Sequence, residues 1–129
     1  MTAATHIAIR DLTMAYGKLV IQRDLSFDIY RGDIFVIMGG SGCGKSTLLK
    51  HMLGLIRPAS GDILYNGSSF VNASAAEQGA MRQSWGITYQ SGGLFSAMTL
   101  AENVSLPLQL YTHYQPAEIR DIVAYKLAL

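Results

Sequence analysis

The sequence is poor in several features that would assign it to particular classes of protein. It has a single cysteine, Cys43, so it cannot form an internal disulfide. Ten Lys and Arg nearly balance nine Asp and Glu, which leaves a formal charge of +1 and no basic surplus for nucleic acid. The longest apolar runs have about five residues, whereas a span of the bilayer needs roughly 18, and the N-terminus lacks the apolar core of a signal peptide. These absences predict one small cytosolic domain that does not bind nucleic acid.

The most informative feature that is present is a glycine-rich run ending in a lysine and two hydroxyl residues. It reads Gly39-Gly40-Ser41-Gly42-Cys43-Gly44-Lys45-Ser46-Thr47. Small residues let consecutive backbone N–H groups turn inward around a phosphate chain without obstruction by Cβ atoms. We expect Lys45 to reach the β and γ phosphates and the Ser46 hydroxyl to bind Mg²⁺. The spacing therefore predicts a site for Mg²⁺ and ATP or GTP.

The residues on both sides of this run favour a phosphate loop over a chance glycine-rich turn. Residues 34–38 are continuously apolar, as expected of a strand that is buried on both faces. After the loop, apolar residues recur at helical spacing until Pro58, and His51 falls on another face of this predicted helix. A dinucleotide-binding fingerprint fails, because a third glycine would be needed where Lys45 stands.

The residues before the loop predict antiparallel strands. Apolar residues alternate with polar ones near Ile7 and again near Phe27, on either side of a turn at Tyr16-Gly17-Lys18. Tyr16 could offer an aromatic face to an adenine ring, although an ordinary turn tyrosine explains it equally well when it is taken alone. Beyond the loop helix, residues 62–65 predict a short strand and Asn66-Gly67 a hairpin turn.

The C-terminal half predicts helices with defined ends and one functional glutamine. Ser74–Glu77 and Thr99–Glu102 have the form of capping boxes, Pro107 is expected to end the second helix, and Pro116 suits the start of a third. Residues 87–89 predict a strand ending at Gln90, a residue that could contact Mg²⁺ or orient a water, or could be a loop glutamine.

Taken together, these motifs resemble the N-terminal part of an ATP-binding cassette (ABC) transporter ATPase. The resemblance covers the whole chain and implies that Tyr16 stacks on adenine, that Lys45 and Ser46 contact phosphate and Mg²⁺, and that Gln90 senses both Mg²⁺ and a membrane subunit. Residues 89–108 are similar to the subfamily that traffics phospholipids, including the maintenance-of-lipid-asymmetry and solvent-tolerance systems. Ser91-Gly92-Gly93 is not interpreted as the family's signature, because it directly adjoins the Gln90 loop.

The resemblance implies an α/β fold of the P-loop NTPase class with a RecA-like parallel core and an N-terminal antiparallel β subdomain. Residues 1–32 and 60–72 would form the β subdomain, 33–58 and 85–90 the core, and 91–129 the start of a helical subdomain. A complete domain continues for roughly another hundred residues with the signature and an acidic Asp-Glu strand. We therefore expect an incomplete domain that binds nucleotide better than it hydrolyses it and that exposes apolar strand edges.

The resemblance also implies partners and a location. A permease subunit would contact the region from Gln90 to Leu100, a second copy of the ATPase would complete a dimer, and the protein would lie on the cytoplasmic face of the cell membrane. The alternative function is a non-catalytic module that holds nucleotide or dimerises without turnover.

Overall fold

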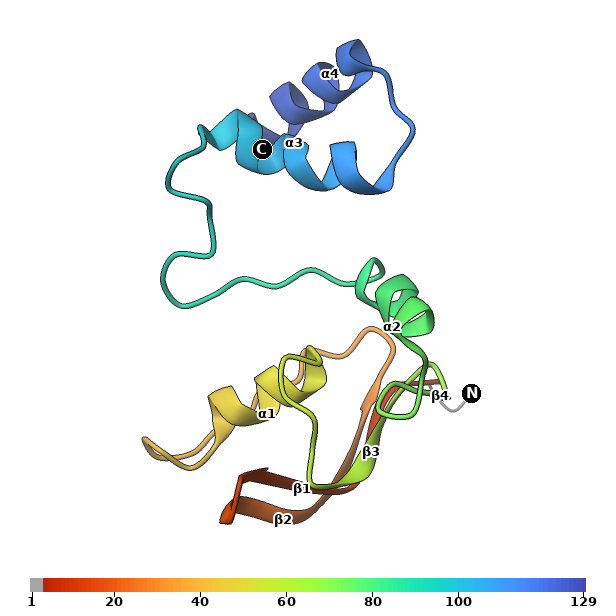
Figure 1. The fold of residues 1–129 in the computed structure, drawn as a ribbon, viewed down its shortest axis with the longest axis vertical. Coiled ribbons are helices and arrows are strands. Elements are labelled where there is room, and N and C mark those ends of the chain that lie inside the picture. Colours follow the sequence, from red (N-terminus) through yellow and green to blue (C-terminus); the bar gives the residue numbers. More distant parts are fainter. Residues whose placement is uncertain (1–3) are drawn as a thin grey trace. The chain divides into compact units, whose positions relative to one another are not determined.

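The computed structural model describes residues 4–129, which form two compact units that meet in the chain between Gly86 and Ile87 (Figure 1). The first unit contains a four-stranded sheet and two short helices, and the second contains two longer helices. The antiparallel sheet at the N-terminus confirms the predicted mixed α/β architecture. The division into functional subdomains stays a prediction.

The sheet of the first unit is built from β1 (Thr5–Tyr16), β2 (Leu19–Tyr30), β3 (Ser60–Tyr65) and β4 (Ser68–Ser69). The strand order is β2-β1-β3-β4, and every neighbouring pair is antiparallel. The turn of Gly17 and Lys18 joins β1 to β2, and Asn66 and Gly67 make the predicted hairpin turn between β3 and β4. Alternation of apolar and polar residues therefore predicted this sheet correctly.

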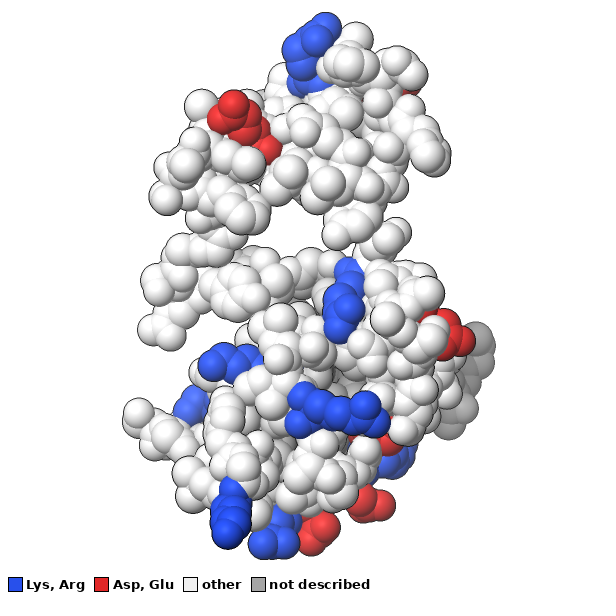
Figure 2. Space-filling model, viewed as in Figure 1, with Lys and Arg blue, Asp and Glu red and all other residues white. Residues whose placement is uncertain are grey.

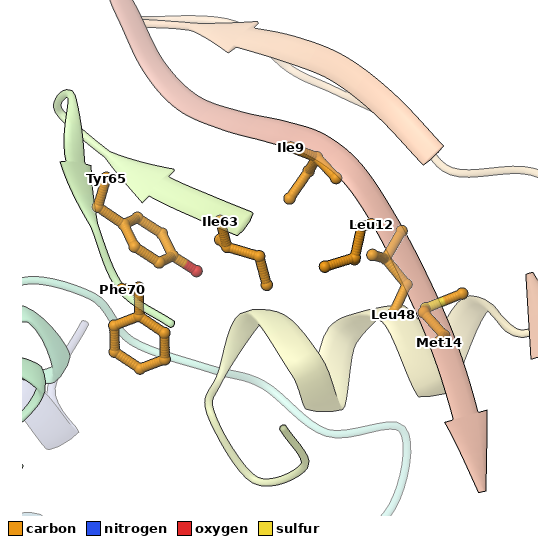
Figure 3. Packing of buried hydrophobic residues seen from close by; sticks show 7 residues of the cluster. All are labelled: Ile9, Leu12, Met14, Leu48, Ile63, Tyr65 and Phe70. Carbon is orange, nitrogen blue, oxygen red and sulfur yellow. The ribbon is translucent and has the colours of Figure 1, made fainter. Parts of the chain in front are cut away.

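The core of the first unit lies between the sheet and helix α1 (Lys45–Met52). Leu48 of α1 meets Leu12 and Met14 of β1, and Ile9 and Ile63 lie beside each other on neighbouring strands (Figure 3). The Tyr65 hydroxyl donates a hydrogen bond of 2.7 Å to the Met52 carbonyl and so joins β3 to the end of α1. This contact anchors the helix that follows the glycine-rich loop.

An aromatic cluster closes the far end of this core. Trp85 lies against Tyr65, with ring centroids 4.3 Å apart, and against Phe70 at 5.6 Å. Burial raises the pKa of Tyr65, because its phenolate form would lose hydration. The short helix α2 (Ala75–Arg82) precedes Trp85 and begins with the predicted capping box of Ser74 and Glu77.

Two predicted core strands do not form. Residues 34–38 and 87–89 lie outside any strand, because a strand needs a neighbouring backbone to pair its N–H and C=O groups, and the part of the chain that the structure describes pairs only β1 to β4. The apolar side chains of residues 34–38 are consequently exposed. The parallel core sheet that the resemblance implied is thus not assembled in this chain.

Helix α1 also differs from its prediction. It ends at Met52, four residues before Ile56, and His51 is almost fully buried instead of lying on an outer face. The His51 ring accounts for part of this difference, because its Nδ1 donates to the Ile56 carbonyl at 2.8 Å and holds the turn after the helix against it. Gly54 has φ of +68°, a conformation that ends helices.

The second unit consists of helices α3 (Leu100–Tyr111) and α4 (Pro116–Leu127). Helix α3 begins with the predicted Thr99–Glu102 capping box, and α4 begins at Pro116 as predicted. The prediction that Pro107 ends α3 is wrong. A proline removes only one N–H from the helical ladder, and contacts with α4 and the 2.9 Å bond from Ser105 Oγ to the Glu102 carbonyl hold the helix around it.

Gly61 gives the sheet a testable dependence on glycine. Its φ is +87°, and a Cβ at this position would lie 2.4 Å from the Asp11 carbonyl oxygen. Gly67 has a similar φ of +83° with open space around it. We expect Gly67→Ala to lose about 1 kcal/mol of unfolding free energy from backbone strain and Gly61→Ala about 2 to 3 kcal/mol. Urea unfolding measures both, and equal losses would show that the approach of β1 to Gly61 is not a constraint.

The capping box of α3 predicts a pH dependence. The Glu102 carboxylate accepts hydrogen bonds from the Thr99 backbone N–H at 2.6 Å and from its hydroxyl at 2.8 Å, which together lower the pKa of Glu102. Since the folded pKa is below the unfolded one, the stabilisation is present above pH of about 4.5 and is lost as the pH falls through the lowered value.

Thr99→Ala should move the pKa of Glu102 back toward its ordinary value without changing that of Glu77. Ser74→Ala, the matched variant at the N-cap of α2, should move the pKa of Glu77 toward its ordinary value and leave that of Glu102 unchanged. Carbon-13 NMR titration of the two carboxyl groups gives both values. A Glu102 pKa that is the same in Thr99→Ala and wild type would contradict this assignment.

Candidate functional site

The glycine-rich loop takes a backbone shape that side chains would prevent. Gly42 and Gly44 have φ of +80° and +99°, values in the region that favours glycine. A Cβ on Gly39 would lie 2.5 Å from Cys43 Sγ, and one on Gly44 would lie 2.8 Å from Ile21 of β2. The positive φ therefore favours glycine at Gly42 and Gly44, and a side chain at Gly39 would require the Cys43 side chain to move.

Side chains of the β1–β2 hairpin pack against this loop at Gly44. Besides Ile21, the position of a Cβ on Gly44 lies 3.5 Å from the Met14 Cε of β1, so the loop rests against side chains of both strands. Sequence reasoning did not assign Met14 and Ile21 to the site. The signal that could have identified them was the alternation along β1 and β2, which places both residues on strands next to the predicted phosphate loop.

The Lys45 side chain folds back over the loop. Its Nζ donates hydrogen bonds of 2.7 Å to the carbonyls of both Gly39 and Gly40, and it lies 3.6 Å from Cys43 Sγ. An ammonium group carries three N–H donors and a full charge in a compact head. The loop carbonyls therefore hold a positive charge next to the backbone N–H groups of residues 39–44.

Helix α1 adds a second positive feature at the same place. The helix begins at Lys45 directly after the Gly44 N-cap, and its first turn contains no acidic side chain. The first N–H groups of a helix lack partners within the helix, and its dipole places partial positive charge there. Ser46 and Thr47 lie in this first turn, so two hydroxyl groups follow the lysine at once. The ammonium, the helix N-terminus and the two hydroxyls thus belong to consecutive residues of the chain.

An apolar cavity of about 500 Å³ adjoins the loop on the sheet side. Lys45 and Gly39 form one part of its wall, and Phe27, Phe35 and Leu48 form another. The rings of Phe27 and Phe35 stack with centroids 5.2 Å apart, and this contact holds the start of the apolar run against β2. The cavity thus adjoins the loop, which contributes Gly39 and Lys45 to its wall, and the rest of its lining comes mainly from apolar residues outside the loop.

The remaining predicted site residues are Tyr16, in the first unit, and Gln90, in the second. Tyr16 is the last residue of β1, where 45% of it is exposed. Gln90 belongs to the second unit and is exposed. The structure brings residues 39–47 together, whereas the joining of Tyr16 and Gln90 to them stays a prediction.

The surface charge follows the near-neutral composition. Figure 2 shows Lys and Arg as separate side chains over the visible face of the first unit, with Asp and Glu among them. Within residues 4–129, three or more His, Cys, Asp and Glu side chains nowhere gather into a potential metal cluster. Over the same described range, every helix is too short or too polar to span a bilayer.

Comparisons with known proteins agree with this geometry. Residues 22–127 match the family model described as ABC transporter. The probable ribonucleotide transport ATP-binding protein mkl of Mycobacterium leprae is 40% identical over all 129 residues, which cover 37% of that protein. The intermembrane phospholipid transport system ATP-binding protein MlaF of Haemophilus influenzae is 38% identical over 121 residues, 94% of this chain and 46% of that protein.

A solved structure gives the same answer for the fold. The dimeric post-hydrolysis state of the ATP-binding cassette MJ0796, bound to ADP and Pi, superposes with a TM-score of 0.82 at 25% identity. The match covers 92% of this chain and 54% of that one, so the chain spans between 37% and 54% of the length of these three proteins. On the agreement of the family model, these relatives and the antiparallel sheet, the chain belongs to the ABC transporter family of ATPases.

Proposed function

We propose that this chain holds Mg²⁺ and ATP through the loop of residues 39–47 as the nucleotide-binding part of a transporter's ATPase subunit. The observation that carries the proposal is the Lys45 ammonium, which donates hydrogen bonds of 2.7 Å to the Gly39 and Gly40 carbonyls of the loop that leads into α1. A triphosphate has the charge and size to replace those carbonyls as the lysine's partner.

The other site residues take roles that follow from their chemistry. The Ser46 hydroxyl is exposed in the first turn of α1 and suits Mg²⁺, a cation that prefers oxygen ligands. Bound Mg²⁺ would neutralise charge on the β and γ phosphates. Tyr16 would stack on adenine, and Gln90 would add an amide oxygen beside the metal. Gly39 to Gly44 would wrap the phosphates with backbone N–H groups.

The second unit supports a docking role for the segment from Gln90 to Leu100. Leu94, Phe95 and Leu100 are each about 60% exposed. Asn103 holds the backbone beneath them, because its side chain accepts from the Phe95 N–H at 2.8 Å and donates to the Phe95 carbonyl at 3.1 Å and the Thr99 carbonyl at 2.9 Å. An apolar surface on a fixed loop suits a helix of a permease subunit on the inner face of the membrane.

For the cargo, we propose phospholipid. MlaF is named for phospholipid transport and is 38% identical, and residues 89–108 resemble the lipid-trafficking subfamily. The mycobacterial relative is named for ribonucleotide transport, so the two relatives are named for different cargoes, and the cargo is a separate proposal from the nucleotide site. In the complete protein, two ATPase copies would enclose the nucleotide.

Lys45→Ala tests the nucleotide site directly. Loss of a charge-assisted hydrogen bond costs about 1.5–3 kcal/mol, so the Kd for ATP should rise about ten- to hundredfold. Lys50→Ala is the matched control, because Lys50 is exposed on the same helix and its substitution removes the same charge. Calorimetric titration with Mg·ATP measures both Kd values. Equal affinity in the two variants would show that the loop does not hold phosphates.

A second candidate function is a nucleotide-holding module without turnover, which the exposed residues 34–38 favour, because a catalytic core sheet is not assembled around them. Phosphate release at saturating Mg·ATP separates the two functions. We expect the 129-residue chain to bind ATP with negligible release, and the complete transporter subunit to release phosphate. Phosphate release by the 129-residue chain alone that Lys45→Ala abolishes would contradict the proposal that this chain binds ATP without hydrolysing it.

A further inference from the structure

The hairpin turn between β3 and β4 places an asparagine directly before a glycine. Asn66 has φ of +50° and Gly67 has φ of +83°, and two positive values in succession define a type I′ turn. A Cβ on Gly67 would meet no atom within 4 Å. The hydrogen bonds found among residues 4–129 include none from the Gly67 N–H. The backbone nitrogen that follows Asn66 is therefore unhindered.

Two side chains donate hydrogen bonds to the Asn66 side chain. Arg31 Nη2 donates to Asn66 Oδ1 at 2.8 Å, and His6 Nδ1 donates to the same oxygen at 2.9 Å. Because an amide oxygen only accepts, the Nδ1 nitrogen of His6 carries the proton in this contact. The Arg31 guanidinium is always charged in proteins. One side-chain carbonyl oxygen thus faces two donors, of which one has a full positive charge.

Backbone hydrogen bonds of the first unit hold this cluster together. The Asn66 N–H donates to the His6 carbonyl at 2.8 Å, and the Arg31 N–H donates to the Ala4 carbonyl at 3.0 Å. Strand β1 lies between β2 and β3, so it brings the end of β2 beside the β3–β4 turn. The donors are consequently fixed on the oxygen by the sheet itself.

We propose that Asn66 is a site of self-modification, in which the Gly67 nitrogen attacks the Asn66 side-chain amide while Arg31 and His6 stabilise its oxygen. The Gly67 N–H gives its proton to solvent, and the nitrogen forms a bond to Asn66 Cγ. The electron pair of the Cγ–Oδ1 double bond moves onto Oδ1, where the two donors meet the developing negative charge. The two donors therefore act as an oxyanion hole.

The intermediate then loses ammonia. The Cγ–Nδ2 bond breaks, Nδ2 takes a proton from solvent as it leaves, and a cyclic imide remains. Water opens this ring at either of its two carbonyls. Opening at Cγ gives an aspartate, and opening at the main-chain carbonyl gives an isoaspartate, whose backbone runs through the former side chain. One water is consumed and one ammonia is released, without oxidation or reduction.

The two products affect the hairpin in opposite ways. An aspartate keeps the backbone and sets a carboxylate against the Arg31 guanidinium, a charge-assisted contact. An isoaspartate adds one atom to the backbone of a two-residue turn and so disturbs the register in which Tyr65 lies opposite Ser68. Phe70, two residues beyond Ser68, is buried in the core. Isoaspartate should therefore loosen the first unit, and either product lowers the formal charge of the chain from +1 by one.

Ageing of the 129-residue chain in mildly alkaline buffer tests the site. Ion-exchange chromatography detects the change in charge, and peptide mapping by mass spectrometry locates it. We expect Asn66 to be converted first, while Asn72 and Asn103 stay intact, because the residues that follow them carry side chains. Conversion of Asn66 no faster than that of Asn72 would overturn the proposal.

Arg31→Ala tests the oxyanion donors. Loss of one exposed hydrogen bond should slow the conversion of Asn66 about two- to tenfold, and His6→Ala should act in the same direction. Arg23→Ala is the matched control, because Arg23 is an exposed arginine of β2, and the contacts of Asn66 are with Arg31 and His6. Faster conversion in Arg31→Ala would show that the contact restrains Asn66 instead of activating it, and would overturn the proposal.

Urea separates the effect of the fold from that of the local sequence. Arg31 and Asn66 are 35 residues apart in the chain, so unfolding removes their contact. Wild type and Arg31→Ala should therefore be converted at equal rates in urea, and the unfolding curves also show that each variant is folded in buffer. A difference in rate that persists in urea would contradict a role for the folded contact and would overturn the proposal.

Discussion

The glycine-rich loop keeps its shape because a positive charge and a set of carbonyls close it from within. Lys45 donates to two backbone carbonyls of the residues that begin the loop, and Gly44 takes a left-handed φ just before the helix starts. Leu48, one turn further along α1, is buried against β1. The position of the lysine is thus fixed by the core of the first unit, and the rest of the site depends on this link between sheet, helix and loop.

The sequence predicted best those features that depend on a few neighbouring residues. The capping boxes at Ser74 and Thr99 formed as predicted, since each needs only a hydroxyl and a carboxylate three residues apart. The Asn66-Gly67 turn formed for the same reason. The phosphate-binding role of the glycine-rich loop also depends on nine consecutive residues only, and it stays a prediction.

The sequence predicted poorly those features that need a distant partner. Residues 34–38 have the composition of a buried strand, but strand formation requires a second backbone, and local pattern does not say whether one is present. Pro107 was misjudged in the opposite direction, since packing between α3 and α4 outweighed the local cost of proline. His51 was misplaced because its hydrogen-bond partner, the Ile56 carbonyl, lies beyond the helix end.

The exposed run of residues 34–38 and the glycine-rich loop are adjacent in the chain, so the strand predicted for the run would lead directly into the loop. In a sheet with neighbours on both sides, residues 34–38 would be buried, and Asp33 and Gly39 would mark the two ends of an inaccessible strand. In this chain the run is exposed, and it is followed by Gly39, whose carbonyl accepts a hydrogen bond from the Lys45 ammonium. Gly39 directly follows this run and is also the first residue of the loop, so the predicted strand and the loop are joined without a linker.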